Sequence, residues 1–184
     1  MKMLQLRLPR WTRRFAGNTQ GVSAVEFALV LPLMLTLYLG GAEFAQAISA
    51  SRKVTLVSRT VADLASQYTT ISDANMTNLL NASATVVAPF SSSALKVTVS
   101  QIKIDANSNA TIEWSDTRGG LTRCGGSATV PAALKVPNTW LIWGEAEYGY
   151  TPAVGYMITG TLQLKEQMYM RPRLSNSVAR TACS

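Results

Sequence analysis

The sequence contains no histidine and only two cysteines among its 184 residues. Without histidine, the Ser-His and Cys-His catalytic pairs are excluded and the commonest metal ligand is missing. Two cysteines are too few for a four-cysteine zinc site. The glycine-rich stretch at residues 117–127, "TRGGLTRCGGS", lacks the spacing of a phosphate-binding loop. We therefore expect no catalytic residue, no metal, no cofactor and no enzymatic activity.

Charged residues are also scarce, at 15% of the chain, and they are unevenly placed. The first 21 residues carry five basic residues and no acid, whereas the remainder has 12 basic and 10 acidic residues. The pair Glu145 and Glu147 has no other catalytic partner and is interpreted as a solvated strand face. A nucleic-acid-binding protein needs basic residues clustered on a folded surface, so we expect no nucleic-acid partner.

A long apolar run follows this basic segment, and it contains an acid near its start, Glu26. The 16 uncharged residues 27–42 span about 24 Å as a helix, short of the ~30 Å hydrocarbon core. Residues 22–42 reach about 31 Å, but they include Glu26. A carboxylate costs roughly 2.5–3.5 kcal/mol at mid-depth in a bilayer, so its presence needs an explanation. The basic segment predicts a cytoplasmic N-terminus.

Three interpretations of this segment differ in the mature N-terminus that they predict. A secretory signal peptide cut near Ala47 would release a soluble periplasmic or secreted binding protein that begins at Ile48. An uncut single-pass tether would retain Met1. Cleavage after Gly21 would make Val22 the first residue, and the new amine would lie one helical turn from Glu26. That acid could then neutralise the amine of a neighbouring subunit inside the apolar layer and fix the axial register.

The third interpretation agrees with a family resemblance. Gly21 followed by four residues and then Glu26-Phe27 resembles the prepilin cleavage motif of type IV pilin-like proteins. The segment "GVSAVEFALVLPLMLTLYLGGAEFAQA" (residues 21–47) resembles the TadE-like pseudopilins of the tight-adherence (Tad) pilus machinery. Two later stretches, "AEYGYTPAVG" and "MYMRPR", resemble the C-terminal half of that family. Tad major pilins are much shorter and usually have Glu-Tyr at this place, which favours a minor pseudopilin.

The resemblance implies a bitopic protein of the bacterial inner membrane whose C-terminal domain is periplasmic, or becomes part of an extracellular pilus. Its implied partners are a prepilin peptidase, the major pilin, sibling minor pseudopilins, the inner-membrane assembly platform and the lipid bilayer. The resemblance assigns cleavage to Gly21 and Val22, and subunit pairing in the membrane to Glu26 and Phe27. Its implied function is to join, initiate or tip a Tad-type pilus.

The rest of the chain predicts an α+β fold. A helix from Val22 to about Tyr68 is expected to have an apolar stripe beyond the membrane at 44, 48, 54, 57, 61, 64 and 68. Pro32 is expected to kink or locally unwind it. A second short helix within 69–87, capped by Ser72, precedes an antiparallel sheet of about four strands near 94–105, 111–115, 139–150 and 157–170. In the first strand the apolar alternation changes parity near Ser100-Gln101, which predicts a bulge. The expected divisions are 1–21 leader, 22–42 transmembrane, 43–70 amphipathic extension and 71–184 extracytoplasmic domain.

The two cysteines, Cys124 and Cys183, are predicted to form a disulfide, because an exported domain folds in an oxidising compartment. The bridge would hold down a C-terminal tail of low apolar content. Two unpaired thiols, or a link from Cys183 to another subunit, are the alternatives.

Overall fold

The computed structural model describes residues 20–120, 122–152, 155 and 159–181. Two helices precede the sheet, α2 (Gln20–Ser66) and α3 (Asp73–Val86). The strands are β1 (Leu95–Ile104), β2 (Ala110–Arg118), β3 (Thr139–Tyr150) and β4 (Leu162–Met170), with short 3-10 turns η1 (Ser92–Ala94) and η2 (Ala132–Leu134). The strands form an antiparallel sheet in the order β2-β1-β3-β4. The predicted α+β fold, with a long helix, a short helix and four strands, is confirmed.

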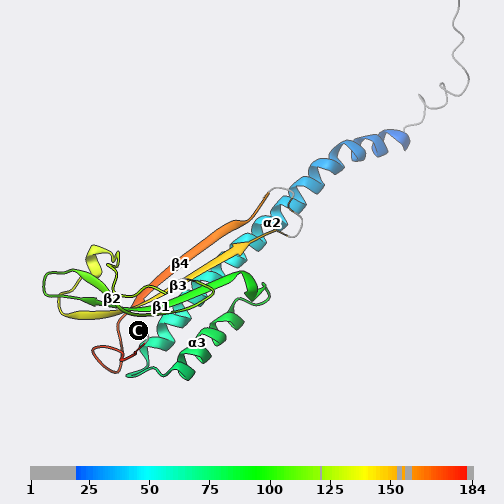
Figure 1. Cartoon of the computed structure of the whole chain (residues 1–184). Coiled ribbons are helices and arrows are strands. Elements are labelled where there is room, and N and C mark those ends of the chain that lie inside the picture. The colour runs from blue at the N-terminus through cyan, green and yellow to red at the C-terminus, as the bar shows by residue number, and fades with distance from the viewer. Residues whose placement is uncertain (1–19, 121, 153–154, 156–158, 182–184) are drawn as a thin grey trace, which may run out of the picture.

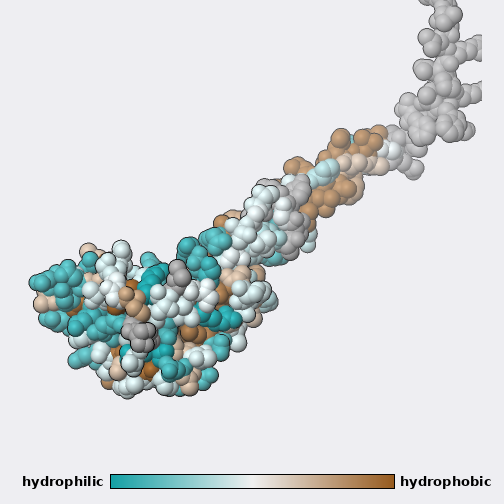
Figure 2. All heavy atoms as spheres, viewed as in Figure 1, coloured by the Kyte–Doolittle hydropathy of each residue, from teal (hydrophilic) through white to brown (hydrophobic). Residues whose placement is uncertain are grey.

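The long helix α2 has two parts with different surroundings (Figure 1). Its second part packs against β3 and β4, whereas its first part extends away from the domain. The helix is unbroken from Gln20 to Ser66, so Pro32 does not unwind it. It ends two residues before the expected Tyr68, where the amides of Gln67 and Tyr68 form the tighter bonds of a 3-10 turn. The projecting part carries the apolar surface seen in brown in Figure 2.

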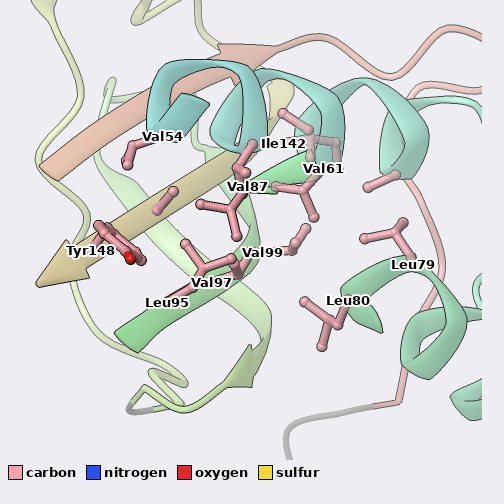
Figure 3. Close-up of a cluster of buried hydrophobic side chains, with 14 of the residues drawn as sticks. Val54, Val61, Leu79, Leu80, Val87, Leu95, Val97, Val99, Ile142 and Tyr148 are labelled. Carbon is pink, nitrogen blue, oxygen red and sulfur yellow. The ribbon is translucent and has the colours of Figure 1, made fainter. Parts of the chain in front are cut away.

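The main core lies between the sheet and the two helices (Figure 3). The residues that α2 contributes to this core are small or β-branched: Ala47, Ala50, Val54, Val57, Val61, Ala62 and Ala65. Phe44 and Ile48, which begin the predicted apolar stripe, are 64% and 40% exposed. At this end of the domain the alanines, and not these two large side chains, belong to the core.

One glycine of β3 allows α2 to approach the sheet closely. A Cβ atom built on Gly144 would lie 2.5 Å from the carbonyl oxygen of Ser58 and 3.0 Å from side-chain atoms of Val61 and Ala62. The Ser58 oxygen belongs to the helix backbone, so it cannot move aside alone. Any side chain at position 144 must therefore push α2 away from the sheet.

We expect Gly144→Ala to lower the free energy of unfolding by about 1–3 kcal/mol, the usual effect of overpacking a core. Chemical denaturation of the purified chain in mild detergent would measure it. Gly126→Ala is the control, because a Cβ there meets no atom within 4 Å. Equal stability of the two variants would contradict the close approach of α2.

A second, smaller core lies on the opposite face of the sheet. It contains Ile102 and Ile104 of β1 together with five other apolar residues: Ala110, Ile112, Val130, Leu141 and Trp143. The parity change in β1 therefore marks a switch of apolar side chains from one face to the other, while β1 remains in regular register with β3. The register shift is at Gln101/Ile102, as predicted, but the extra residue is Glu113 in β2.

The start of α3 has the predicted N-cap. Ser72 is the N-cap of α3, and its hydroxyl accepts a hydrogen bond from the amide of Asn75 at 3.3 Å. Asp73 lies in the first turn, where the helix dipole favours an acid.

The C-terminal tail docks through its own contacts. The amide of Val178, which is fully buried, donates to the Gln101 side chain at 2.6 Å, and its carbonyl accepts from the Trp114 indole at 2.8 Å. Ala179 exchanges backbone hydrogen bonds with Thr69 and Ile71 in the turn between the helices. The tail therefore does not depend on a disulfide alone to hold it, contrary to the expectation from its low apolar content.

Arg180 in the same tail contacts both the sheet and the turn between α2 and α3. The Arg180 side chain is 6% exposed and makes a two-pronged contact with Asp116, one bond of which is 2.7 Å long. It also donates to the carbonyl oxygen of Ile71 at 3.1 Å. The hydrogen bonds to Asp116 raise the pKa of Arg180 above its ordinary value, so the guanidinium stays charged.

Candidate functional site in the projecting helix

The predicted cleavage and pairing residues lie together in the first two turns of α2. Val22 and Phe27 are 54% and 62% exposed, and Glu26 is also exposed. Val22 and Glu26 are four residues apart, so they share one face of the helix. A Cβ at Gly21 would meet no atom within 4 Å. The folded chain therefore has no steric need for glycine at position 21.

The projecting part of α2 has the properties of a membrane span. Among the described residues, α2 is the one helix long and apolar enough to cross a bilayer, and its most apolar 18-residue window is not buried at all. Such an unburied apolar surface is unstable in water. One long apolar helix near the N-terminus indicates a single-pass membrane protein.

The junction between the projecting part and the domain contains a buried acid, Glu43, which is 4% exposed. Its carboxylate lies near Tyr150 of β3. Burial, with a smaller contribution from the Glu43 charge, raises the pKa of Tyr150. In the sequence, Glu43 is the charged residue that directly follows the uncharged run 27–42. The alanines at positions 47 and 50, one turn apart on the buried side, were the signal that this side of the helix faces protein.

Only one of the two cysteines of the predicted disulfide lies among the described residues. Cys124 is disulfide-bonded and lies in an exposed loop. Cys183 is outside the described residues, so its pairing with Cys124 stays a prediction. The neighbouring Arg123 anchors this loop: its guanidinium lies 5.2 Å from the ring centre of Trp143, and it donates to Glu145 at 3.0 Å.

The other polar feature is an open groove of about 670 Å³ on the sheet face away from the helices. Two of its acids are ion-paired, Glu145 with Arg123 and Glu147 with Lys165, each at 3.0 Å. Burial raises the pKa of Glu145, whereas the hydrogen bond from Lys165 lowers that of Glu147. The described residues contain no group of three His, Cys, Asp or Glu side chains placed to hold a metal ion. The groove thus contains paired charges on a strand face and offers no evident chemistry.

In the comparison with known protein families, the match falls on the helix that carries the candidate site. Residues 21–63 match the family described as TadE-like protein, a segment that begins at Gly21 and covers nearly all of α2. No curated protein and no solved structure gives a significant match to the chain. The chain is therefore TadE-like over residues 21–63, and the resemblance predicted from its sequence is confirmed for that segment.

Proposed function

We propose that this protein is a minor pseudopilin that joins, initiates or tips a Tad-type pilus after a prepilin peptidase has removed residues 1–21. The observation that carries the proposal is the Gly21–Glu26 spacing at the start of an exposed apolar helix that bears a folded α+β domain. Residues 21–35 of this helix are exposed in the part of the chain that the structure describes, and such a surface is suited to pack against other subunits. The domain would remain outside the cytoplasm, in the periplasm or on the fibre.

The proposed role of Glu26 is electrostatic. Cleavage gives Val22 a cationic amine, and Glu26 carries the opposite charge on the same face of the helix. Each charge is unfavourable in an apolar layer by itself, whereas a pair formed between two subunits removes both from that position. Because the pair forms at one axial offset, it would also set the register between neighbouring helices. The partners would be the major pilin and sibling pseudopilins on the inner-membrane assembly platform.

Two structural features support this proposal over release of a soluble protein. Ala47, next to the alternative signal-peptidase site, is buried in an unbroken helix, and residues 47–65 supply one side of the core. Cleavage there would remove Glu43 and the first contacts between α2 and the sheet. N-terminal sequencing of the mature protein separates the three interpretations, because it should find Val22 for the pseudopilin, Ile48 for the soluble protein and Met1 for the uncut tether.

Glu26→Ala is expected to be cleaved and inserted normally, because removal of a charge makes insertion easier. We expect the processed variant to remain in the membrane and to be lost from sheared pilus fractions, measured by immunoblotting both fractions. Val25→Ala, which trims a neighbouring exposed side chain and leaves the charge, should enter the assembly. Equal incorporation of Glu26→Ala and the parent chain would show that the acid has no assembly role.

A further inference from the structure

Trp140, near the start of β3, is the described tryptophan that belongs to neither core of the domain. Trp114 and Trp143 are both buried in the apolar clusters, whereas Trp140 is half-buried and packs in neither of them. Its indole nitrogen donates to the Glu113 carboxylate at 3.0 Å, and the Lys103 ammonium lies 5.9 Å from its ring centre. Polar contacts therefore hold this ring in place, without the apolar packing that usually explains an aromatic residue in a strand.

Trp140 lines a pocket of about 210 Å³ between the start of β3 and the chain that follows β4. The pocket lies at the end of the domain opposite the projecting helix, because β3 runs from Thr139 at the pocket to Tyr150 near Glu43 (Figure 1). Drug-sized ligands occupy pockets of about 300–1,000 Å³, so this one suits a single small ring. Its other lining residues are polar apart from one proline: Asn138, Thr139, Arg171, Pro172, Ser175 and Asn176.

Arg171 brings a guanidinium with unused hydrogen-bonding capacity to this pocket. Five arginines follow α2 in the sequence. Four of them bond to a carboxylate or a carbonyl oxygen: Arg118, Arg123, Arg173 and Arg180. Arg171 is exposed, and it makes no ion pair or hydrogen bond within the part of the chain that the structure describes. A guanidinium can donate two parallel hydrogen bonds to a carboxylate, so the pocket can accept a carboxylate from outside.

The amide and hydroxyl groups of the pocket can both donate and accept hydrogen bonds. The side-chain amides of Asn138 and Asn176 form no hydrogen bond with a described residue, and each amide has donors and an acceptor. The hydroxyls of Thr139 and Ser175 already donate to carbonyl oxygens at 2.6 Å, so they are left as acceptors. This mixture matches a sugar, whose hydroxyls both donate and accept. A carboxylate by itself would use only the donors.

We propose that the pocket binds an acidic sugar, namely a uronic acid residue of a polysaccharide. Its carboxylate would pair with Arg171, and its hydroxyls would bond with Asn138 and Asn176. The apolar C–H face of its ring would lie against Trp140, because the electron-rich face of an aromatic ring attracts weakly positive hydrogens. The proposal goes beyond the role in pilus assembly and needs neither cleavage at Gly21 nor a second subunit, so either can fail without the other.

The test uses the full chain in nanodiscs of phosphatidylcholine, a lipid without net charge, and isothermal titration calorimetry at one salt concentration. The probes are trigalacturonate, its neutral methyl ester, and N-acetyl-triglutamate amide, a peptide with the same number of carboxylates and no sugar ring. We expect trigalacturonate to bind at least about tenfold more tightly than the other two probes. Equal affinity for the ester would remove the carboxylate contact, and equal affinity for the peptide would remove the sugar contact. Either result, or no saturable binding of trigalacturonate, would overturn the proposal.

Arg171→Ala should weaken the binding of trigalacturonate about tenfold or more, since hydrogen bonds between charged groups are lost. Arg173→Ala is the matched control, because it removes the same charge two residues along the chain from a guanidinium that is already paired with Asp63. That variant should bind as the parent chain does. Equal losses for the two variants would mean that positive charge in general attracts the probe, which contradicts a site at Arg171.

Trp140→Leu should weaken the binding of trigalacturonate about threefold to tenfold, because the ring contact is lost while an apolar side chain remains. Unchanged affinity of this variant would overturn the placement of the sugar against Trp140. Denaturant unfolding of each variant in detergent checks that the loss does not come from an unfolded domain. Arg171 is exposed and Trp140 lies outside both cores, so we expect both variants to fold.

Discussion

A Gly21→Leu variant is expected to accumulate as the full-length precursor, with residues 1–21 still attached. The reason is local to the cleavage reaction. A scissile bond must lie extended in the peptidase cleft, and glycine has no side chain to obstruct it there. In the folded chain, a side chain at position 21 meets no atom within 4 Å, so the substitution should leave the domain intact.

The structure provides a matched control for this experiment. Gly41 lies in the same exposed part of α2, and a Cβ there also meets no atom within 4 Å. Gly41→Leu should therefore be cleaved as the parent chain is. Intact mass of the membrane-extracted protein distinguishes precursor from mature chain. Normal processing of Gly21→Leu would refute the assignment of this glycine to a prepilin cleavage site.

Arg180→Ala is expected to be the most destabilising single change in the tail, lowering the free energy of unfolding by about 3–5 kcal/mol. The arginine side chain is 6% exposed and that of Asp116 is 18% exposed, so its removal leaves a largely buried carboxylate without its cation. The carbonyl oxygen of Ile71 loses a donor at the same time. The exposed contact between Arg180 and Asp73 adds little, because Asp73 is 99% exposed.

Arg173→Ala is the control, because Arg173 lies in the same tail and also pairs with an aspartate, Asp63 of α2. Its side chain is 58% exposed, and exposed pairs are worth at most about 1 kcal/mol. Denaturant unfolding of both variants in detergent should therefore give clearly different losses. The double variant Arg180→Ala/Asp116→Ala should recover part of the loss. Similar losses for the two arginine variants would show that burial does not determine the strength of these pairs.

The sequence was sufficient for the elements that depend on local patterns. The basic segment, the apolar run and the Gly21–Glu26 spacing located the projecting helix, and Ser72 located the start of α3. The four strands followed from alternation and turn residues. These signals act over a few residues, so they are visible without knowledge of the tertiary structure.

The features that the sequence did not reveal depend on which side of an element faces protein. Ala47 and Ala50 are buried against the domain whereas Phe44 and Ile48 are exposed, and hydropathy alone does not show which side of the helix faces protein. The parity change at Ile102 predicted a bulge in β1, whereas the sheet has a core on each face and the extra residue lies in β2. Val178 and Arg180 form hydrogen bonds with residues 64 to 109 positions away in the sequence, and no local pattern indicates such contacts.

The docking of the tail has a consequence for the timing of biogenesis. The guanidinium of Arg180 and the amide of Ala179 bind the turn between the helices, so α2, α3 and β2 cannot complete their contacts until the chain has been made past residue 180. Synthesis at about 5–20 residues per second separates Ile71 from Arg180 by roughly 5 to 20 s. During that interval α2 is already available for insertion, whereas the sheet side of the domain is incomplete. On the proposed topology, α2 can therefore enter the membrane before the domain has folded, and the strands lack their tail contacts until residue 180 has been made.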